Sequence, residues 1–250
     1  MNATRFFPNF IPLLALLLGL LPTAIAAQAA DGSAILAKID QYRNFQAEGF
    51  SFQYAVSDPA DPATPASIMR VYLKKADRNA VLCVYLSPAD QQDRRILVQK
   101  NSFWLLDRSM RDPIRISARQ MMFGQASAGD ITRISYATTY QVEKSTSEGE
   151  TSVLDLAALK DVEVSYPVIR LRIRSSDSRP IKAELFAATG TILKTIDYTD
   201  FKAFSGKTLL SGFTITNLLN KETSRVVLDK FKPETLADRF FSQGGMKVLP

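Results

Sequence analysis

The sequence predicts a mainly β (α+β) protein with one large domain: a strongly curved antiparallel sheet or open barrel with a few helices over its concave face. Three observations lead to this prediction. Segments with period-two alternation follow one another through most of the chain, and short turns join them. Helical periodicity is confined to one N-terminal segment and a short mid-chain stretch. The chain has 250 residues, a length that suits one large β domain.

The N-terminal residues have the features of a secretory signal peptide. Arg5 supplies a positive charge, residues 11–21 are almost wholly apolar, and the small-residue triplets Ala24–Ala26 and Ala27–Ala29 follow. Each triplet fits a signal peptidase site, so we expect cleavage after one of them. An uncleaved membrane anchor is the alternative.

The expected domain organisation follows from this cleavage. Residues 1–29 form the cleaved signal peptide, and residues 30–250 form a single mature domain. No cysteine follows the apolar segment, so the lipid-attachment site of a lipoprotein is missing. We therefore expect a periplasmic protein that is exported but is not itself a lipoprotein.

The first mature element is predicted to be a helix that Ser33 caps. Its apolar residues recur at helical spacing and form one stripe, which consists of Ile35, Leu36, Ile39, Tyr42 and Phe45. The period then changes to two, with Phe50, Phe52 and Tyr54 on one face of a strand. A loop rich in proline, at residues 58–65, ends this strand.

The rest of the chain alternates between predicted strands and turns, with one helical interval. Strands are expected at residues 67–75, 80–86, 95–100, 102–107, 137–145, 151–159, 168–175, 181–186, 192–201, 209–217 and 224–231. Short helical pieces are expected at residues 117–123 and 129–133. Ala188–Gly190 marks a hairpin turn between two of the strands. The N-terminal and mid-chain helices are the elements available to cover the concave face of the sheet.

The composition excludes several classes of enzyme. The chain has no histidine, and Cys83 is its only cysteine. A Cys/His zinc site, a Ser-His-Asp triad and a Cys-His dyad are therefore impossible within one chain. Cys83 lies in an apolar run and is expected to be a buried hydrophobe rather than a reactive thiol. We expect no enzyme activity, no metal site and no cofactor.

Carboxylate-based hydrolysis is the catalytic alternative that this composition leaves open. A glycosidase needs two acids that converge in a cleft. The acidic residues are scattered along the chain, and Asp107, Asp112 and Asp130 lie near arginines. We expect these three carboxylates to form salt bridges or helix caps.

The charge pattern argues against nucleic acid as a partner. The formal net charge is +6, but no block of five or more like charges occurs. One strand places Arg170, Arg172 and Arg174 on one face and apolar residues on the other. This arginine row is either the solvated outer face of a half-buried sheet or a contact for lipid headgroups or an acidic membrane partner.

Six aromatic and methionine residues are the candidates to line or cover an internal apolar cavity. Methionine and phenylalanine present an adaptable apolar surface, which suits a ligand of variable shape. Ordinary core packing is the alternative for each of them. The candidates are Phe52, Tyr54, Trp104, Met121, Met122 and Phe123.

Several motifs occur in an order that resembles a known family. An aromatic strand leads into Asp112–Ser117, and the segment Gly124–Ile131 follows with a Gly-x-x-x-x-Gly-Asp-Ile pattern. In the second half, Arg179–Glu184, the hairpin Ala188–Thr195 and the closing Arg239–Phe241 match as well. The chain is similar to the outer-membrane lipoprotein-sorting protein family, in the superfamily of the periplasmic lipoprotein carrier LolA. The likeness covers nearly the whole mature chain.

This resemblance implies both a fold and a function. The implied fold is an unclosed antiparallel β-barrel or half-barrel with helices as a lid over an apolar cavity. The implied function is to shelter the acyl chains of a lipoprotein or another lipid on the way from the inner to the outer membrane. The alternative is an accessory protein of an inner-membrane exporter of the ABC or RND type, without lipid-carrier activity. We expect a monomer that contacts membranes transiently and has no catalytic residues.

Overall fold

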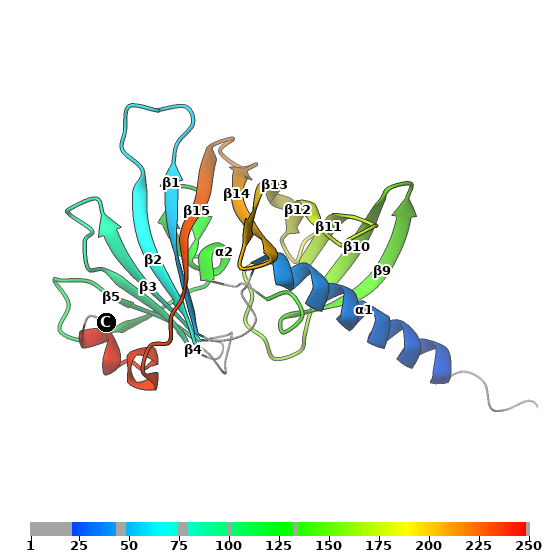
Figure 1. The fold of residues 1–250 in the computed structure, drawn as a ribbon, viewed down its shortest axis with the longest axis horizontal. Helices are drawn as coiled ribbons and strands as arrows, with labels where there is room; N and C mark the ends of the chain where they lie inside the picture. Colours follow the sequence, from blue (N-terminus) through cyan, green and yellow to red (C-terminus); the bar gives the residue numbers. More distant parts are fainter. Residues whose placement is uncertain (1–21, 44–48, 75–79, 100–101, 133–134, 249–250) are drawn as a thin grey trace, which may run out of the picture.

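One antiparallel sheet of 13 strands dominates the structure, a computed structural model that describes residues 22–43, 49–74, 80–99, 102–132 and 135–248. The sheet is strongly curved and open, with β6 and β9 as its two edges (Figure 1). Its strands are β1 (Phe50–Ser57), β2 (Ser67–Leu73), β3 (Val81–Ser87), β4 (Arg95–Gln99), β5 (Ser102–Leu106), β6 (Ile114–Ile116), β9 (Tyr140–Glu148), β10 (Thr151–Ala158), β11 (Val168–Arg174), β12 (Pro180–Phe186), β13 (Ile192–Phe204), β14 (Lys207–Asn217) and β15 (Thr223–Pro233). The predicted half-barrel is confirmed.

The strand order shows how the chain builds this sheet. It runs β6-β5-β4-β3-β2-β1-β15-β14-β13-β12-β11-β10-β9, so two meanders of sequential strands meet where β1 pairs with β15. In that pairing Tyr54 lies opposite Leu228 and Val56 opposite Val226. The segment between the two meanders is therefore free to leave the sheet and cross its concave face.

The crossing segment forms a small lid. It contains the short hairpin of β7 (Met121–Phe123) and β8 (Ala126–Ser127), followed by one helical turn, α2 (Ala128–Thr132). The helix expected at residues 129–133 is thus found, but the helix expected at residues 117–123 is wrong. Gly124, with φ of +47°, closes the hairpin turn instead, a conformation that favours glycine.

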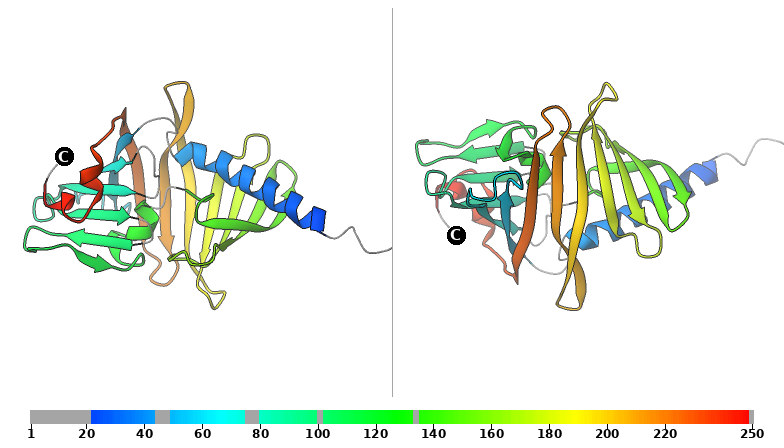
Figure 2. Two further views of the ribbon diagram at one scale, coloured as in Figure 1. Left: turned by 90° about the horizontal axis from the view of Figure 1, so that it is seen from below. Right: turned by 90° about the horizontal axis from the view of Figure 1, so that it is seen from above.

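The N-terminal helix α1 (Pro22–Arg43) lies across the half of the sheet that contains β9 to β14 (Figure 2). The predicted stripe is confirmed at Leu36 and Ile39, which are buried, and at Ile35, which packs against the same core. Tyr42 is partly buried, and its ring packs edge to face against Phe201. Phe45 lies outside the described residues. The predicted cap at Ser33 is wrong, since the helix already begins at Pro22 and runs without a break through Asp31, Gly32 and Ser33. Among the described residues, we find no helix that is long and apolar enough to cross a membrane.

Both faces of the first meander are buried. On β3, Val81, Cys83 and Tyr85 face the main core under the lid, while Leu82 and Val84 face a second apolar cluster on the outer side. The 3-10 turns η1 (Asp238–Phe241) and η2 (Gly245–Lys247) cover this outer cluster. Burial raises the pKa of the Cys83 thiol, in agreement with the expected inert hydrophobe.

Candidate functional site

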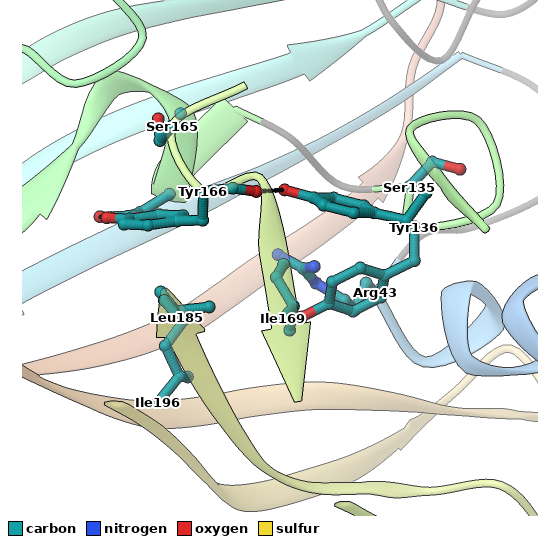
Figure 3. A pocket seen from close by; sticks show the side chains of 11 residues that line it. Arg43, Ser135, Tyr136, Ser165, Tyr166, Ile169, Leu185 and Ile196 are labelled. Carbon is teal, nitrogen blue, oxygen red and sulfur yellow. Dashed lines mark hydrogen bonds between the residues drawn. The ribbon is translucent and has the colours of Figure 1, made fainter. Parts of the chain in front are cut away.

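The candidate site is a pocket between the concave face of the sheet, α1 and the lid (Figure 3). Apolar side chains from three adjacent strands form its floor, and tyrosines and polar residues from the surrounding segments form its walls. The lining residues are Arg43, Gly129, Asp130, Ser135, Tyr136, Tyr140, Ser165, Tyr166, Ile169, Leu185 and Ile196. Figure 3 shows Tyr166 above Leu185 and Ile196, and Arg43 beside Ile169 and Tyr136.

The pocket is small in this closed form. Its volume is about 40 Å³, whereas pockets for small organic ligands usually measure roughly 300 to 1,000 Å³. A volume of this size has room for a few water molecules at most. An elongated apolar ligand can therefore enter only if the lid or α1 moves.

A buried ion pair joins the lid to the floor of the site. The ammonium group of Lys194, on β13, donates hydrogen bonds to the carboxylate of Asp130 at 2.8 Å and to the backbone oxygen of Gln125 at 2.6 Å. The side chains of Lys194 and Asp130 are only 8% and 2% exposed. Asp130 also accepts hydrogen bonds from the backbone N–H of Ser127 and from the hydroxyl of Tyr166. Burial, with the Asp130 carboxylate beside it, raises the pKa of Tyr166, which keeps its hydroxyl protonated as a donor.

Two tyrosine hydroxyls add further polar ties beneath the lid. Tyr54 on β1 donates to the backbone oxygen of Ile131 at 3.3 Å, and Tyr85 on β3 donates to that of Met122 at 3.2 Å. The fully buried apolar side chains of the described lid segment are mostly small: Ala118, Ala126, Ala128 and Ile131. Met122 packs partly against the same core. Specific hydrogen bonds therefore contribute to holding the lid in place.

On the opposite side of the pocket, α1 fixes the loop that leads into β9. The Asp40 carboxylate accepts hydrogen bonds from the Ser135 hydroxyl at 2.6 Å and from the backbone N–H groups of Tyr136 and Ala137. Burial raises the pKa of Asp40, although these hydrogen bonds oppose the shift. The hydroxyls of Tyr136 and Tyr198 lie 2.6 Å apart, which links this loop to β13.

The geometry explains why glycine stands at position 129 of the Gly-Asp-Ile motif. A Cβ atom there would lie 2.5 Å from the Ser165 hydroxyl oxygen and 3.1 Å from the Ala118 backbone oxygen. The next two residues of the motif are the ion-paired Asp130 and the buried Ile131. In this motif, Gly129 lets the lid backbone approach Ser165 and Ala118 closely, Asp130 forms the ion pair with Lys194, and Ile131 packs in the core.

The structure brings together only some of the six predicted cavity residues. Phe52 and Tyr54 are buried in the main core beneath the lid, and their rings lie edge to face. Met122 packs partly against this core, whereas Met121 is 40% exposed. The side chain of Phe123 lies outside what the structure describes. None of the five candidates whose side chains are described lines the small pocket itself.

Trp104 requires a correction. It lies on β5 between Phe103 and Leu105, which face the main core, so its own side chain points to the outer face of the sheet. There it packs against the outer apolar cluster. The prediction failed because both faces of this strand carry large apolar residues, and alternation alone does not say which face is concave.

Sequence reasoning missed the residues that line the pocket and hold the lid. Lys194 could have been found from the sequence, because it shares a strand face with Ile196 and Tyr198 and so interrupts an inward-facing apolar pattern. Asp130 was recognised as part of a motif and as a carboxylate in a salt bridge or cap, but its partner Lys194 was not. Arg43 and Tyr136 gave no such signal, since their positions depend on how α1 and an irregular loop cross the sheet.

The arginine row faces outward, as its alternation predicts, and the apolar residues between the arginines are buried. Each arginine contacts an acid: Arg170 with Asp155 at 2.8 Å, Arg172 with Glu148 at 2.5 Å and Arg174 with Asp177 at 2.5 Å. The Arg174 guanidinium holds the pKa of Asp177 well below its usual range. The row is therefore a partly exposed network of alternating charges rather than an uncompensated basic strip.

The three acids considered for hydrolysis are all ion-paired. Asp107 contacts Arg94 at 2.7 Å, Asp112 contacts Lys247 at 2.5 Å, and Asp130 contacts Lys194. These pairs confirm the expectation that the three carboxylates form salt bridges. Within the described part of the chain, no cluster of three or more potential metal-binding side chains occurs.

Comparison with solved structures identifies the class of fold. A LolA superfamily protein from Nitrosomonas europaea is 26% identical, with a TM-score of 0.74 over 84% of this chain and 97% of the other. A DUF1329 family protein from Desulfovibrio piger is 14% identical, with a TM-score of 0.70 over 88% and 99% of the two chains. An outer membrane lipoprotein-sorting protein domain from Vibrio parahaemolyticus is 17% identical, with a TM-score of 0.67 over 88% and 100%. The protein has the LolA-like fold.

The family follows from the sequence comparison. A family model described as "Uncharacterized protein" matches residues 77–248. The chain belongs to this family, and its likeness to the solved LolA superfamily protein places it in the LolA-like class. None of the curated proteins compared with the chain matches it.

The buried ion pair yields a first prediction. Replacing one partner, by Lys194→Met or Asp130→Asn, should lower the free energy of unfolding by about 3–5 kcal/mol, because the other polar group stays buried without its partner. The matched control is Lys202→Met at the exposed pair of Lys202 and Asp229, where a loss of about 0.2–1 kcal/mol is expected. Urea unfolding measures both. Equal losses at the two sites would contradict the anchoring role of Lys194.

The arginine row yields a second prediction. Replacing Arg170, Arg172 and Arg174 together by Gln should lower the thermal midpoint by only roughly 2–4 °C, since the pairs are partly exposed and solvent-screened. Sedimentation with anionic liposomes should show little change, because the neighbouring acids already balance the row. A strong loss of liposome binding at low salt would instead support a contact surface.

Proposed function

We propose that the protein is a periplasmic carrier that shelters the acyl chains of a lipoprotein or another lipid between its curved sheet and its lid, during transfer from the inner to the outer membrane. The supporting observation is the combination of an extensive apolar concave face with a lid that hydrogen bonds help to hold. Membership of the LolA-like family supports the same class of function.

The energetics of transfer favour such an enclosure. Each acyl CH2 group exposed to water costs about 0.8 kcal/mol, so a lipid needs an apolar shelter to cross an aqueous compartment. Aliphatic residues of three neighbouring strands, Ile169, Leu185 and Ile196, already face the pocket. Displacing the lid would extend this surface along the concave face without breaking any bond of the 13-stranded sheet.

Opening exposes apolar side chains on both the lid and the sheet, and burial energy scales with the apolar area removed from water. A bound acyl chain would cover this surface again, which offsets the cost. Separation of Lys194 from Asp130 and release of the tyrosine hydroxyls add to the cost of opening. In the open state, Phe52, Tyr54 and Met122 would join the wall of the cavity, and Met121 and Phe123 would lie on the lid beside its entrance.

A third prediction tests this proposal. A fluorescent fatty acid should bind with low-micromolar or tighter affinity, and the double variant Lys194→Met/Asp130→Asn should bind it faster, because its lid is tied less firmly and no unpaired charge stays buried. The double variant Lys202→Met/Asp229→Asn is the matched control and should bind at the wild-type rate. Stopped-flow fluorescence measures the rates, and circular dichroism verifies that each variant is folded.

Two results would overturn the carrier proposal. One is a folded wild-type protein and a folded lid variant that both fail to bind the fatty acid. The other is protein purified from its native periplasm that contains no lipid by mass spectrometry and yet co-purifies with an inner-membrane exporter. The second result would support the exporter-accessory alternative.

A fourth prediction concerns export. We expect the mature periplasmic chain to begin at Ala27 or Ala30, which intact-mass measurement will reveal. The residues of α1 that pack in the core, Leu36, Ile39 and Asp40, follow both cleavage sites and stay in the mature protein. Recovery of the full-length chain in the membrane fraction would contradict cleavage.

A further inference from the structure

A second pocket lies on the outer face of the sheet, away from the lid. Arg95 on β4 shares this face with Leu97, which belongs to the outer apolar cluster. The pocket has a volume of about 260 Å³ where β4 and β5 meet the C-terminal 3-10 turn. Its lining residues are Asp93, Arg95, Leu106, Asp107, Arg108, Met110, Arg111 and Lys247.

The charges around this pocket are unevenly matched. Both of its carboxylates are engaged, Asp93 by Arg108 at 2.5 Å and Asp107 by Arg94 at 2.7 Å. Lys247 contacts Asp112 at 2.5 Å. Across the described ranges of the chain, no carboxylate lies within ion-pair distance of the remaining two cations, which are Arg95 and Arg111.

Arg95 is an unusual residue for such a position. Arg95 is only 9% exposed, and its Nε atom is buried without a hydrogen-bond partner in the described structure. One terminal nitrogen donates to the backbone oxygen of Met246. Burial lowers the pKa of the Arg95 guanidinium, which reflects the cost of holding a cation away from water. An anion in the adjoining pocket would offset this cost.

We propose that this outer pocket binds a phosphate group, with Arg95 at its base and Arg111 at its rim. Two cations without carboxylate partners match the charge of a phosphate dianion better than that of a single carboxylate. The guanidinium fork also fits phosphate oxygens in a bidentate manner. Leu106 and Met110 form an apolar wall that can contact the organic part of a phosphate ester. The phosphate can come from free inorganic phosphate or from a phospholipid headgroup.

The position of Trp104 supplies a built-in reporter. It is the only tryptophan of the chain and packs against the outer cluster. Of the residues that line the pocket, Leu106 belongs to this cluster and Met110 packs against it. A ligand in the outer pocket should therefore shift its emission. A fatty acid beneath the lid, on the opposite face of the sheet, should leave that emission nearly unchanged, so the two sites can be followed separately.

The test is a titration of the full mature protein at constant ionic strength. Inorganic phosphate and, in a separate arm, dihexanoyl phosphatidic acid below its micelle concentration are added, with acetate as the anion control. Calorimetry and Trp104 emission report binding. The expected result is saturable binding of at least one phosphate compound, with an affinity well above that of acetate. Tighter binding of the lipid than of inorganic phosphate would assign the site to headgroups, and the reverse order to free phosphate.

Variants decide whether the arginines carry this binding. Arg95→Gln and Arg111→Gln should each weaken phosphate binding by about tenfold or more, the effect expected for loss of a charge-assisted hydrogen bond. Arg111 is exposed, so its variant keeps the test decisive even if Arg95→Gln fails to fold. The matched control is Arg115→Gln, at an exposed arginine outside the pocket that contacts Glu163 at 3.3 Å. Phosphate binding no tighter than acetate binding, or equal affinities for Arg111→Gln and wild type, would overturn the proposal.

Discussion

The contact between Lys194 and Asp130 determines how the concave face of this protein is closed. A lysine on an inward-facing strand position would be costly beneath an apolar core without a partner. The lid supplies that partner, together with the backbone oxygen of Gln125. The position of the lid is therefore set by a charge that the sheet cannot leave unpaired. The Gly129 approach to Ser165 and the Tyr54 bond to Ile131 follow from that placement.

Closure by polar contacts has a consequence for movement of the lid. Hydrogen bonds are directional and are lost over a short displacement, whereas a large apolar interface resists separation over its whole area. The lid combines buried and partly buried hydrogen bonds from Tyr54, Tyr85 and Lys194 with fully buried apolar side chains that are mostly alanines. By contrast, η1 and η2 hold the outer face with Phe240, Phe241 and Met246, all buried. One face of the sheet is thus built to stay closed, and the other is suited to open.

The sequence predicted the sheet well because apolar and polar residues alternate along many of its strands. Over residues 169–174 of β11, three arginines alternate with three aliphatic residues, and the structure puts the two sets on opposite faces. The candidate site was harder to predict, because its lining comes from α1, the loop at Tyr136 and the segment at Tyr166. Contacts among such distant segments depend on the curvature of the sheet. Trp104 failed for a related reason, since β5 is apolar on both faces.

The most direct test of a movable lid is hydrogen exchange at its own amides. The N–H group of Gln125 in the lid donates to the Ser224 hydroxyl of β15 at 3.0 Å, so it should exchange when the lid leaves the sheet. If the lid moves as a unit, this amide will exchange much faster than that of Ile215 in the buried strand β14, and a bound fatty acid will change its rate. Exchange of both amides at one rate set by global unfolding, unaffected by fatty acid, would contradict a movable lid.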